Sequence, residues 1–187
     1  LDERLGGLQA GELIVFAARP SMGKSSLVLN VITNCVLYQG LSVAHFSTES
    51  TATAVTERML CAIGKVDGYR ARGGFLNRAE KRNYLNACEM LEPAPLFIDD
   101  SPALSTMELR AKGRRLKAQH NVEMIVIDYM QLMTGSAEAA RQSRQIEVSE
   151  ISRQTKALAR ELEIPIICLA QLSRKVEERK EKKPMMS

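Results

Sequence analysis

The stretch "AARPSMGKSSL", residues 17–27, decides how the rest of the sequence is interpreted. It matches the phosphate-binding pattern G-x-x-x-x-G-K-[ST], except that Ala18 stands where the first glycine is expected. An apolar run at 12–18 leads into it, and apolar residues at helical spacing follow it as far as Gly40. Strand, tight turn and helix in this order are what a phosphate cradle of backbone N–H groups needs.

The residues of this turn have separate roles in binding a nucleotide. Gly23 can adopt the backbone angles of a tight turn and lets phosphate approach the chain closely. Lys24 is expected to reach the β- and γ-phosphates of ATP, and the Ser25 hydroxyl is expected to bind Mg²⁺. Ala18 replaces the glycine with the fewest contacts, and its methyl group fits if its φ is negative. The predicted nucleotide-binding residues are Ser21, Met22, Gly23, Lys24, Ser25 and Ser26.

Apolar runs alternate with amphipathic stretches along the rest of the chain. The runs predict strands at 12–18, 42–47, 94–100, 123–129 and 164–171. The stretches between them predict helices at 24–39, 51–64, 77–91, 105–119 and 142–162. The helix at 105–119 opens with Ser105 as N-cap and Glu108 at the capping-box position, whereas 65–75 and 134–141 are predicted loops. Strands that alternate with helices predict an α/β fold with a mostly parallel sheet and helices on both faces.

Three polar side chains stand at the carboxyl ends of predicted strands. Asp128 ends the run in "MIVIDY", where an acid can hold Mg²⁺, and Glu49 follows the strand in "AHFSTES", where a carboxylate can polarise a water. Gln171 ends "IICLAQ", where its amide can bond an oxygen of the γ-phosphate. Open α/β sheets bind ligands at this edge, so we predict that these side chains converge on the phosphate turn. The predicted catalytic residues are Lys24, Glu49 and Gln171, and the predicted Mg²⁺ ligands are Ser25 and Asp128.

The composition fits one cytoplasmic domain. The chain has 187 residues, enough for one folded unit with a sizeable core. Aromatic residues make up 4% and Trp is absent, which argues against an aromatic stacking platform for nucleic acid, and a net charge of +4 permits an anionic partner without requiring one. No apolar run reaches the roughly 18 residues of a membrane span. The four cysteines are far apart in sequence, so we expect free thiols in a reducing compartment.

Several stretches together closely resemble the motor domain of the bacterial replicative DNA helicases, the DnaB family of RecA-like ATPases. They are "GGLQAGELIVFAARPSMGKSSL", "FSTES", "IVIDYMQLM", "EVSEISRQTKALARELEIPIICLAQLSR" and "KKPMMS", and they cover nearly the whole chain. In that family the phosphate turn usually reads A-R-P-[SA]-M-G-K-[ST]. The resemblance therefore makes Ala18 an expected residue rather than a defect.

The resemblance implies a RecA-like P-loop core that works in a ring, normally hexameric, with ATP at the subunit interfaces and single-stranded DNA in the channel. It implies that Asp128 holds the metal, Glu49 polarises water and Gln171 senses the γ-phosphate. It also implies primase and a helicase loader as partners. Family loops at about 134–144 and 174–183 would line the channel. The DNA contacts expected there are Arg141, Arg144, Arg174, Lys175, Lys182 and Lys183.

The sequence departs from the family pattern beside two of these residues. The family commonly has S-L-E-M where this chain has Ser47, Thr48, Glu49 and Ser50, which makes the surroundings of the glutamate more polar. Its S-Q-L becomes "AQL" here, which keeps Gln171. Residues 1–187 are expected to form a single RecA-like domain, truncated at both ends relative to a longer parent. No trans-acting arginine finger can be assigned within them, so the isolated chain is expected to hydrolyse ATP slowly.

Two other functions fit part of the pattern. A recombination ATPase of the RecA or RadA type would share the core and form a filament on DNA instead of a ring. A non-catalytic, ATP-gated loading switch would share the cradle but has no need of a water-polarising acid such as Glu49. A small-molecule kinase is less well supported, because neither a substrate lid nor a second basic clamp is evident.

Overall fold

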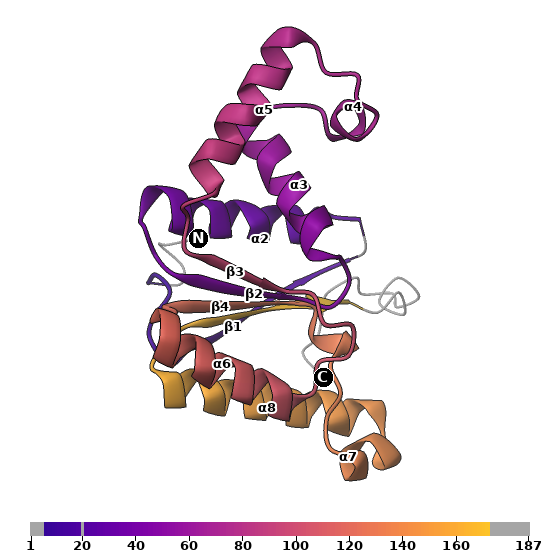
Figure 1. Ribbon diagram of the computed structural model, residues 1–187. Helices are drawn as coiled ribbons and strands as arrows, with labels where there is room; N and C mark the ends of the chain where they lie inside the picture. Colours follow the sequence, from indigo (N-terminus) through magenta and orange to yellow (C-terminus); the bar gives the residue numbers. More distant parts are fainter. Residues whose placement is uncertain (1–5, 20, 173–187) are drawn as a thin grey trace.

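The computed structural model describes residues 6–19 and 21–172, and in this part of the chain five parallel strands form one sheet (Figure 1). Their spatial order is β1-β5-β4-β2-β3. The strands are β1 (Leu13–Ala18), β2 (Val43–Ser47), β3 (Leu96–Asp99), β4 (Met124–Asp128) and β5 (Ile166–Gln171). All five expected strands are confirmed, and the predicted α/β class with them.

The central strands are apolar on both faces because helices cover both sides of the sheet. In β4, Met124 and Val126 point into one core, and Ile125 and Ile127 point into the other. The edge strand β1 is less covered, and its Val15 is exposed. A parallel sheet buried on both faces needs such near-continuous apolar runs, which is why the sequence showed runs rather than strict alternation.

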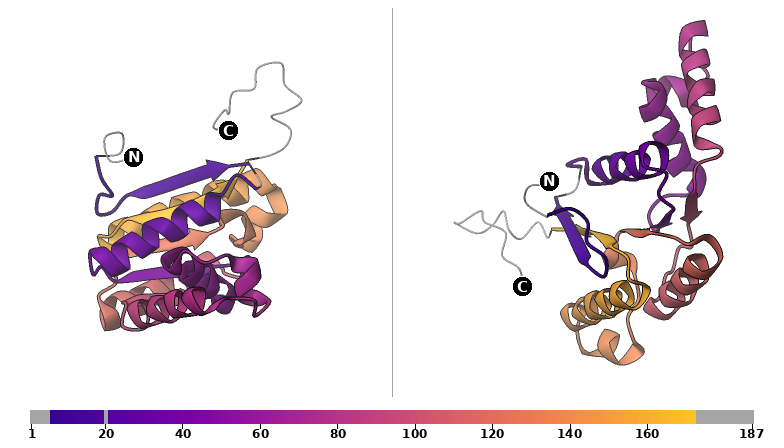
Figure 2. Two further views of the ribbon diagram at one scale, coloured as in Figure 1. Left: turned by 90° about the horizontal axis from the view of Figure 1, so that it is seen from above. Right: turned by 90° about the vertical axis from the view of Figure 1, so that its left-hand side faces the viewer.

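Two helical layers enclose the sheet (Figure 2). One layer holds α2 (Lys24–Thr33), which continues as the π-helix η1 (Asn34–Tyr38), and α3 (Ala52–Gly64). The other holds α6 (Thr106–His120) and α8 (Arg144–Leu162). The predicted capping box of α6 is confirmed, since Ser105 and Glu108 bond each other's backbone N–H groups.

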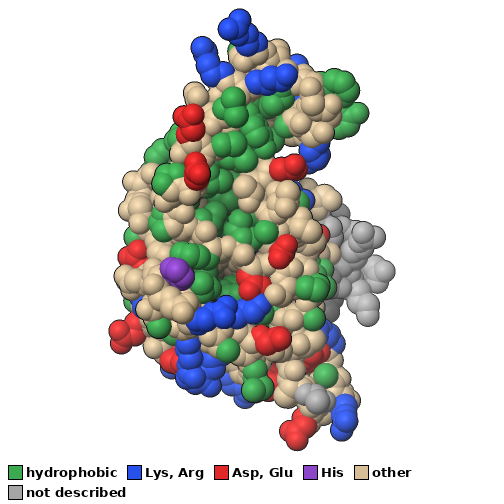
Figure 3. Space-filling model, viewed as in Figure 1, with side chains coloured by type: hydrophobic (Ala, Val, Ile, Leu, Met, Phe, Trp, Pro, Cys, Tyr) green, Lys and Arg blue, Asp and Glu red, His purple; other side chains and the backbone are tan. Residues whose placement is uncertain are grey.

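Helices α4 (Gly68–Arg72) and α5 (Arg78–Leu91) stand beyond α3, away from the sheet (Figure 1). Helix α5 packs closely on α3 at Gly64, where an added Cβ would lie 3.0 Å from the Asn83 carbonyl oxygen. Lys and Arg side chains gather at the tip of α5, and again over the α6 and α8 layer (Figure 3). Among the described helices, none combines the length and the apolar character that a membrane span requires.

Two predicted loops contain helices. Within 65–75, Asp67 accepts a hydrogen bond from the Arg70 N–H and so caps α4. Within 134–141, Ser136 caps α7 (Ala137–Gln142) by accepting from the Ala139 N–H, and the 3-10 helix η2 (Met130–Leu132) precedes it. Both helices are too short to show an apolar period, so their capping residues were the only signal in the sequence.

Candidate nucleotide site

The phosphate turn joins the end of β1 to the start of α2. Ser21 and Gly23 have φ values of 62° and 77°, so the chain passes twice through the left-handed region. A Cβ built on Gly23 meets nothing within 4 Å, which means that the backbone angle, not space, requires glycine there. Gly23 is the N-cap of α2 and makes no side-chain cap bond. The N–H groups of the first helical turn are therefore available to an anion.

Ala18 fits the turn because it belongs to the strand. It is the last residue of β1, pairs with Gln171 of β5, and is not among the described residues with positive φ. Its carbonyl oxygen accepts a hydrogen bond of 3.0 Å from the Leu172 N–H. The condition set by the sequence, a negative φ at this position, is met.

Lys24 lies between two residues at the end of β4. Its Nζ is 3.7 Å from Asp128 Oδ1 and 4.5 Å from the centroid of the Tyr129 ring. Only 12% of the lysine side chain and 11% of the aspartate side chain are exposed. The peptide bond between Asp128 and Tyr129 is cis. The ammonium group is thus held over the sheet edge by a carboxylate and a ring face.

The oxygen donors at this edge fit a magnesium ion. Asp128 Oδ1, the oxygen that faces Lys24, is buried and accepts no hydrogen bond from the described residues, so it can also serve as a ligand for a cation. The half-buried Ser25 opens α2 beside Lys24. No cluster of three or more His, Cys, Asp or Glu side chains occurs in the described part. Mg²⁺ in nucleotide sites takes one or two protein ligands together with phosphate oxygens, which agrees with this sparse donor set.

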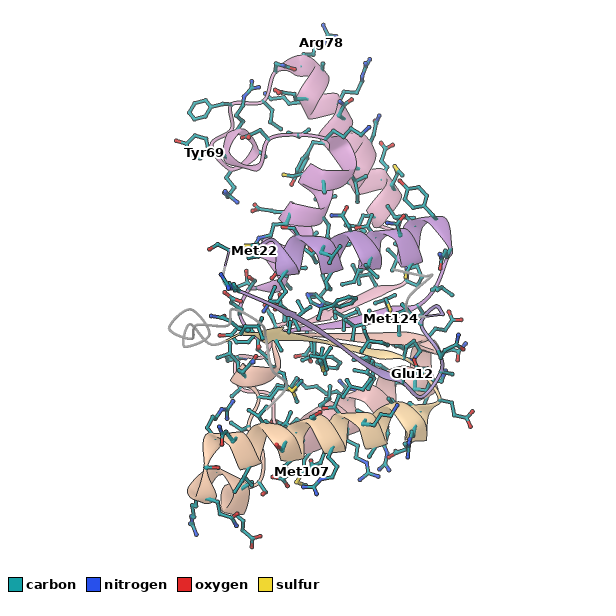
Figure 4. The ribbon with its side chains drawn as sticks, turned by 180° about the vertical axis from the view of Figure 1, so that it is seen from behind. Glu12, Met22, Tyr69, Arg78, Met107 and Met124 are labelled. Carbon is teal, nitrogen blue, oxygen red and sulfur yellow. The ribbon has the colours of Figure 1, made fainter. Side chains whose placement is uncertain are left out.

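A cavity of about 420 Å³ lies over the turn and brings the predicted catalytic residues together. Its lining consists of Ala18, Arg19, Ser21, Gly23, Lys24, Ser25, Ser26, Glu49 and Gln171. Met22 is 72% exposed and is not in this lining, so any contact of Met22 with a nucleotide would come from its backbone. In Figure 4, Met22 lies at one end of the sheet, opposite Glu12 and Met124. The cavity is at the carboxyl ends of the strands, as the sequence predicted.

Glu49 stands in a short turn held on both sides. The Ser47 hydroxyl donates to the Ser50 carbonyl oxygen at 2.6 Å and accepts from the Ser50 N–H at 3.2 Å. The Thr48 N–H donates to the carbonyl oxygen of Asp128 at 2.8 Å. Glu49 itself is exposed at the cavity. The turn thus presents the carboxylate to the space above the phosphate turn.

Gln131 is a site residue that the sequence analysis missed. Its side-chain amide donates to the Gln171 carbonyl oxygen at 3.1 Å and accepts from the Gln171 N–H at 3.2 Å. The pairing of β4 with β5 ends at Ile127 and Cys168, so this amide replaces the strand partner that Gln171 lacks on that side. A polar residue inside the apolar stretch "YMQLM" was the available signal.

The residues predicted to contact DNA have different surroundings. Arg141 is exposed in the last turn of α7. Arg144 opens α8, and its guanidinium donates to the Gln131 and Met133 carbonyl oxygens and to the Glu147 carboxylate. Its contact with DNA stays a prediction, and the structure adds that it already ties η2 to α8. Arg174, Lys175, Lys182 and Lys183 lie outside the described residues.

Known proteins resemble this chain along its whole length. Residues 1–187 match the model of a family described as the DnaB-like helicase C terminal domain. The chain is 46% identical to the replicative DNA helicase DnaB of Geobacillus stearothermophilus and 45% identical to the replicative DNA helicase DnaC of Bacillus subtilis (strain 168). Both alignments cover 100% of this chain and 41% of the relative. The chain therefore spans about two fifths of the relatives it matches.

Two solved structures share the fold. One is a DnaB-like replicative helicase, described with its interactions with primase, which superposes with a TM-score of 0.86 at 30% identity over 97% of this chain and 43% of that one. The other is the ATPase domain of G40P, with a TM-score of 0.85 at 30% identity over 95% of this chain and 63% of that one. These likenesses support the RecA-like assignment of the fold.

Proposed function

The chain belongs to the DnaB-like helicase C-terminal domain family, and from this premise we propose that it is the ATP-hydrolysing motor domain of a replicative DNA helicase. The observation that carries the proposal is the single cavity lined by Lys24, Glu49 and Gln171. These residues follow or end three strands far apart in the sequence, and residues of the phosphate turn line the same cavity.

The phosphate turn and its surroundings bind ATP in this proposal. The N–H groups at the start of α2 receive phosphate oxygens, and the Lys24 ammonium pairs with the β- and γ-phosphates. Ser25 and the buried Asp128 carboxylate hold Mg²⁺. When bound, the ion neutralises the charge that develops on the β- and γ-phosphate oxygens.

Glu49 and Gln171 supply the catalytic step. The Glu49 carboxylate accepts a hydrogen bond from the attacking water and orients it toward the γ-phosphorus, because it is exposed at the cavity rather than paired inside the protein. The Gln171 amide bonds a γ-oxygen and loses that bond after hydrolysis. Gln171 ends β5, which pairs with the strand that carries Asp128. Loss of the bond between Gln171 and the γ-oxygen therefore changes the contacts at this edge of the sheet.

The wider assembly is also part of the proposal. It comprises a homo-oligomer, normally a hexameric ring, with ATP at subunit interfaces, single-stranded DNA in the channel, and primase and a helicase loader as partners, working in the cytoplasm. The support comes from the relatives, which are named as replicative DNA helicases, and from a similar structure described with primase. No observation favours a recombination ATPase or a loading switch.

The test is ATP turnover by the complete protein at several protein concentrations, with and without single-stranded DNA. Lys24→Ala serves as the blank, and Lys81→Ala on the exposed surface of α5 is the matched lysine control. We expect turnover that rises faster than linearly with protein, that DNA stimulates, and that only Lys24→Ala abolishes. Turnover near the blank and indifferent to DNA would refute the motor assignment.

A further inference from the structure

We propose that Thr48 is a positioning residue of the nucleotide site, whose hydroxyl fixes the backbone of Asp128 relative to Glu49. This inference rests on the proposed function, because it assigns a role within the same site. Thr48 is half-buried and touches the strand end that carries the metal-binding carboxylate.

The Thr48 hydroxyl uses both its donor and its acceptor on one peptide group. It donates to the Asp128 carbonyl oxygen at 3.0 Å and accepts from the Tyr129 N–H at 3.2 Å. The Thr48 N–H donates to the same Asp128 oxygen at 2.8 Å. The peptide that follows Asp128 is therefore held at its oxygen and at its nitrogen by one residue.

That peptide joins the two groups that flank Lys24. On one side is the Asp128 carboxylate, 3.7 Å from Lys24 Nζ, and on the other is the Tyr129 ring, 4.5 Å away. The last residue pair of β2 and β4 is Ser47 with Asp128, so the chain beyond this pair lies outside the residue pairing of the two strands. The three hydrogen bonds of Thr48 fix this part of the chain instead. They hold the Asp128 carboxylate and the Tyr129 ring around the Lys24 ammonium group.

The same residue fixes the base of the Glu49 turn. Glu49 follows Thr48 directly, and the paired bonds between Ser47 and Ser50 close the turn on the other side. The position of the water-polarising carboxylate is thereby tied to the position of the metal-binding one. The geometry points to Thr48 as the link between these two acids.

An apolar side chain at position 48 cannot make this link. Leucine, which the family pattern has at this place, keeps the backbone N–H bond but offers neither partner to the peptide after Asp128. Thr48→Val preserves the branched shape and removes the hydroxyl, whereas Thr48→Ser keeps the hydroxyl and removes the methyl group. The two variants therefore separate hydrogen bonding from packing.

The experiment measures ATP turnover of the complete protein and, separately, the binding of a fluorescent ADP analogue titrated with Mg²⁺ and in EDTA. For Thr48→Val we expect kcat to fall about ten- to a hundredfold and the Mg²⁺ concentration for half-maximal binding to rise about tenfold, as when a partner that orients a ligand is lost. Binding in EDTA should change less than about twofold, because the phosphate turn is intact. Thr48→Ser should stay within about threefold of the unmodified protein in every measurement.

Three outcomes would decide against the inference. If Thr48→Val has the same kcat and the same Mg²⁺ dependence of binding as the unmodified protein, the hydroxyl positions nothing. Equal impairment of Thr48→Val and Thr48→Ser would show that the shape of the threonine side chain, not its hydrogen bonding, carries the effect. The third outcome concerns the proposed function itself. If the unmodified protein in Mg²⁺ binds the ADP analogue no better than Lys24→Ala does, the proposed function is overturned, and the inference with it. If Thr48→Val does not fold, as judged by thermal unfolding, Thr48→Ala replaces it with the same expectations.

Discussion

Two connections leave the same edge of the sheet and end in helices, yet they are built in opposite ways. The turn after β1 leads into α2, and its described bonds are local, such as the one of 3.4 Å from the Met22 N–H to the Arg19 carbonyl oxygen. The connection after β4 leads into α8, and acids of α8 bond back to it. Glu147 accepts from the Gly135 N–H at 3.0 Å, and Glu150 accepts from the Ser136 hydroxyl at 2.8 Å.

The difference concerns where the backbone N–H groups are directed. In the first connection they open α2 without a side-chain cap, beside the cavity that Gly23 and Lys24 line, so a ligand can complete their hydrogen bonding. In the second connection, carboxylates of the protein already complete it. The turn after β1 is thus suited to binding phosphate, whereas the segment after β4 is suited to transmitting position from the sheet to α8.

The largest effect is expected at Glu49, the acid that lines the cavity. Glu49→Gln removes the carboxylate that we propose orients the water, and turnover should fall about 10²- to 10⁴-fold, the usual contribution of a general base. Nucleotide affinity should change less than about threefold, because the phosphate cradle is separate from the carboxylate. Steady-state turnover and equilibrium binding of ATP measure the two quantities. Glu92→Gln, an exposed acid at the end of α5, is the control, and a fall in turnover of similar size there would remove the assignment.

A smaller effect is expected where the connection after β4 bonds the end of β5, the strand that lies between β1 and β4. Gln131→Met keeps the length of the side chain and removes both bonds to Gln171. Turnover should fall about tenfold, as for the loss of a group that orients a catalytic residue. Single-turnover and steady-state ATP hydrolysis check this, with Gln119→Met near the end of α6 as the matched control. Turnover unchanged in Gln131→Met would mean that the strand alone positions Gln171.

The second connection should show its dependence on acids in thermal unfolding. The pKa of Glu147 is lowered from its ordinary value of 4.5, first by the hydrogen bond from the Gly135 N–H and then by Arg144. A carboxyl with a lowered folded pKa stabilises the fold above its unfolded pKa, and this stability is lost as the pH falls through the folded pKa.

Glu147→Gln should accordingly lower the Tm at pH 7 by about 2–4 °C, the shift that loss of one charge-assisted hydrogen bond gives in a domain of this size. The difference from the unmodified protein should shrink as the pH is taken below 4.5. Thermal unfolding followed by circular dichroism across this pH range measures it. Glu138→Gln, an exposed acid in the first turn of α7, is the control, and a Tm difference that stays constant with pH would contradict the role of the charge.

The same contrast explains what could be predicted from the sequence. The strand, the turn around Gly23 and the helix after it were predictable because their signals act within a few residues. The capping box of Ser105 and Glu108 is local in the same way. The role of Gln131 was not predictable, because its partner Gln171 lies 40 residues away in the sequence.

The convergence of Lys24, Glu49 and Gln171 on one cavity was predictable for a different reason. Parallel strands place their carboxyl ends at one edge, so strand assignments alone bring such residues together. What strand assignments do not give is the bonding inside the connections. Arg144 was therefore expected to face DNA, and its bonds to η2 and Glu147 appear only in the folded chain.

The smallest expected effect separates Arg144 from its neighbour Arg141, since only Arg141 is exposed without a role in joining η2 to α8. If the segment at 134–144 lines a DNA channel, Arg141→Ala should weaken binding of single-stranded DNA about threefold and reduce the dependence of log affinity on log salt by about 0.7, the value of one phosphate contact. Its Tm should stay unchanged.

Arg144→Ala should instead lower the Tm by about 2–4 °C, because it removes charge-assisted bonds within the protein. Salt-dependent DNA binding and thermal unfolding of both variants decide the matter. Equal loss of the salt dependence in the two variants would mean that Arg144 leaves its internal partners to contact DNA, and the second connection would then bind a ligand as the first one does.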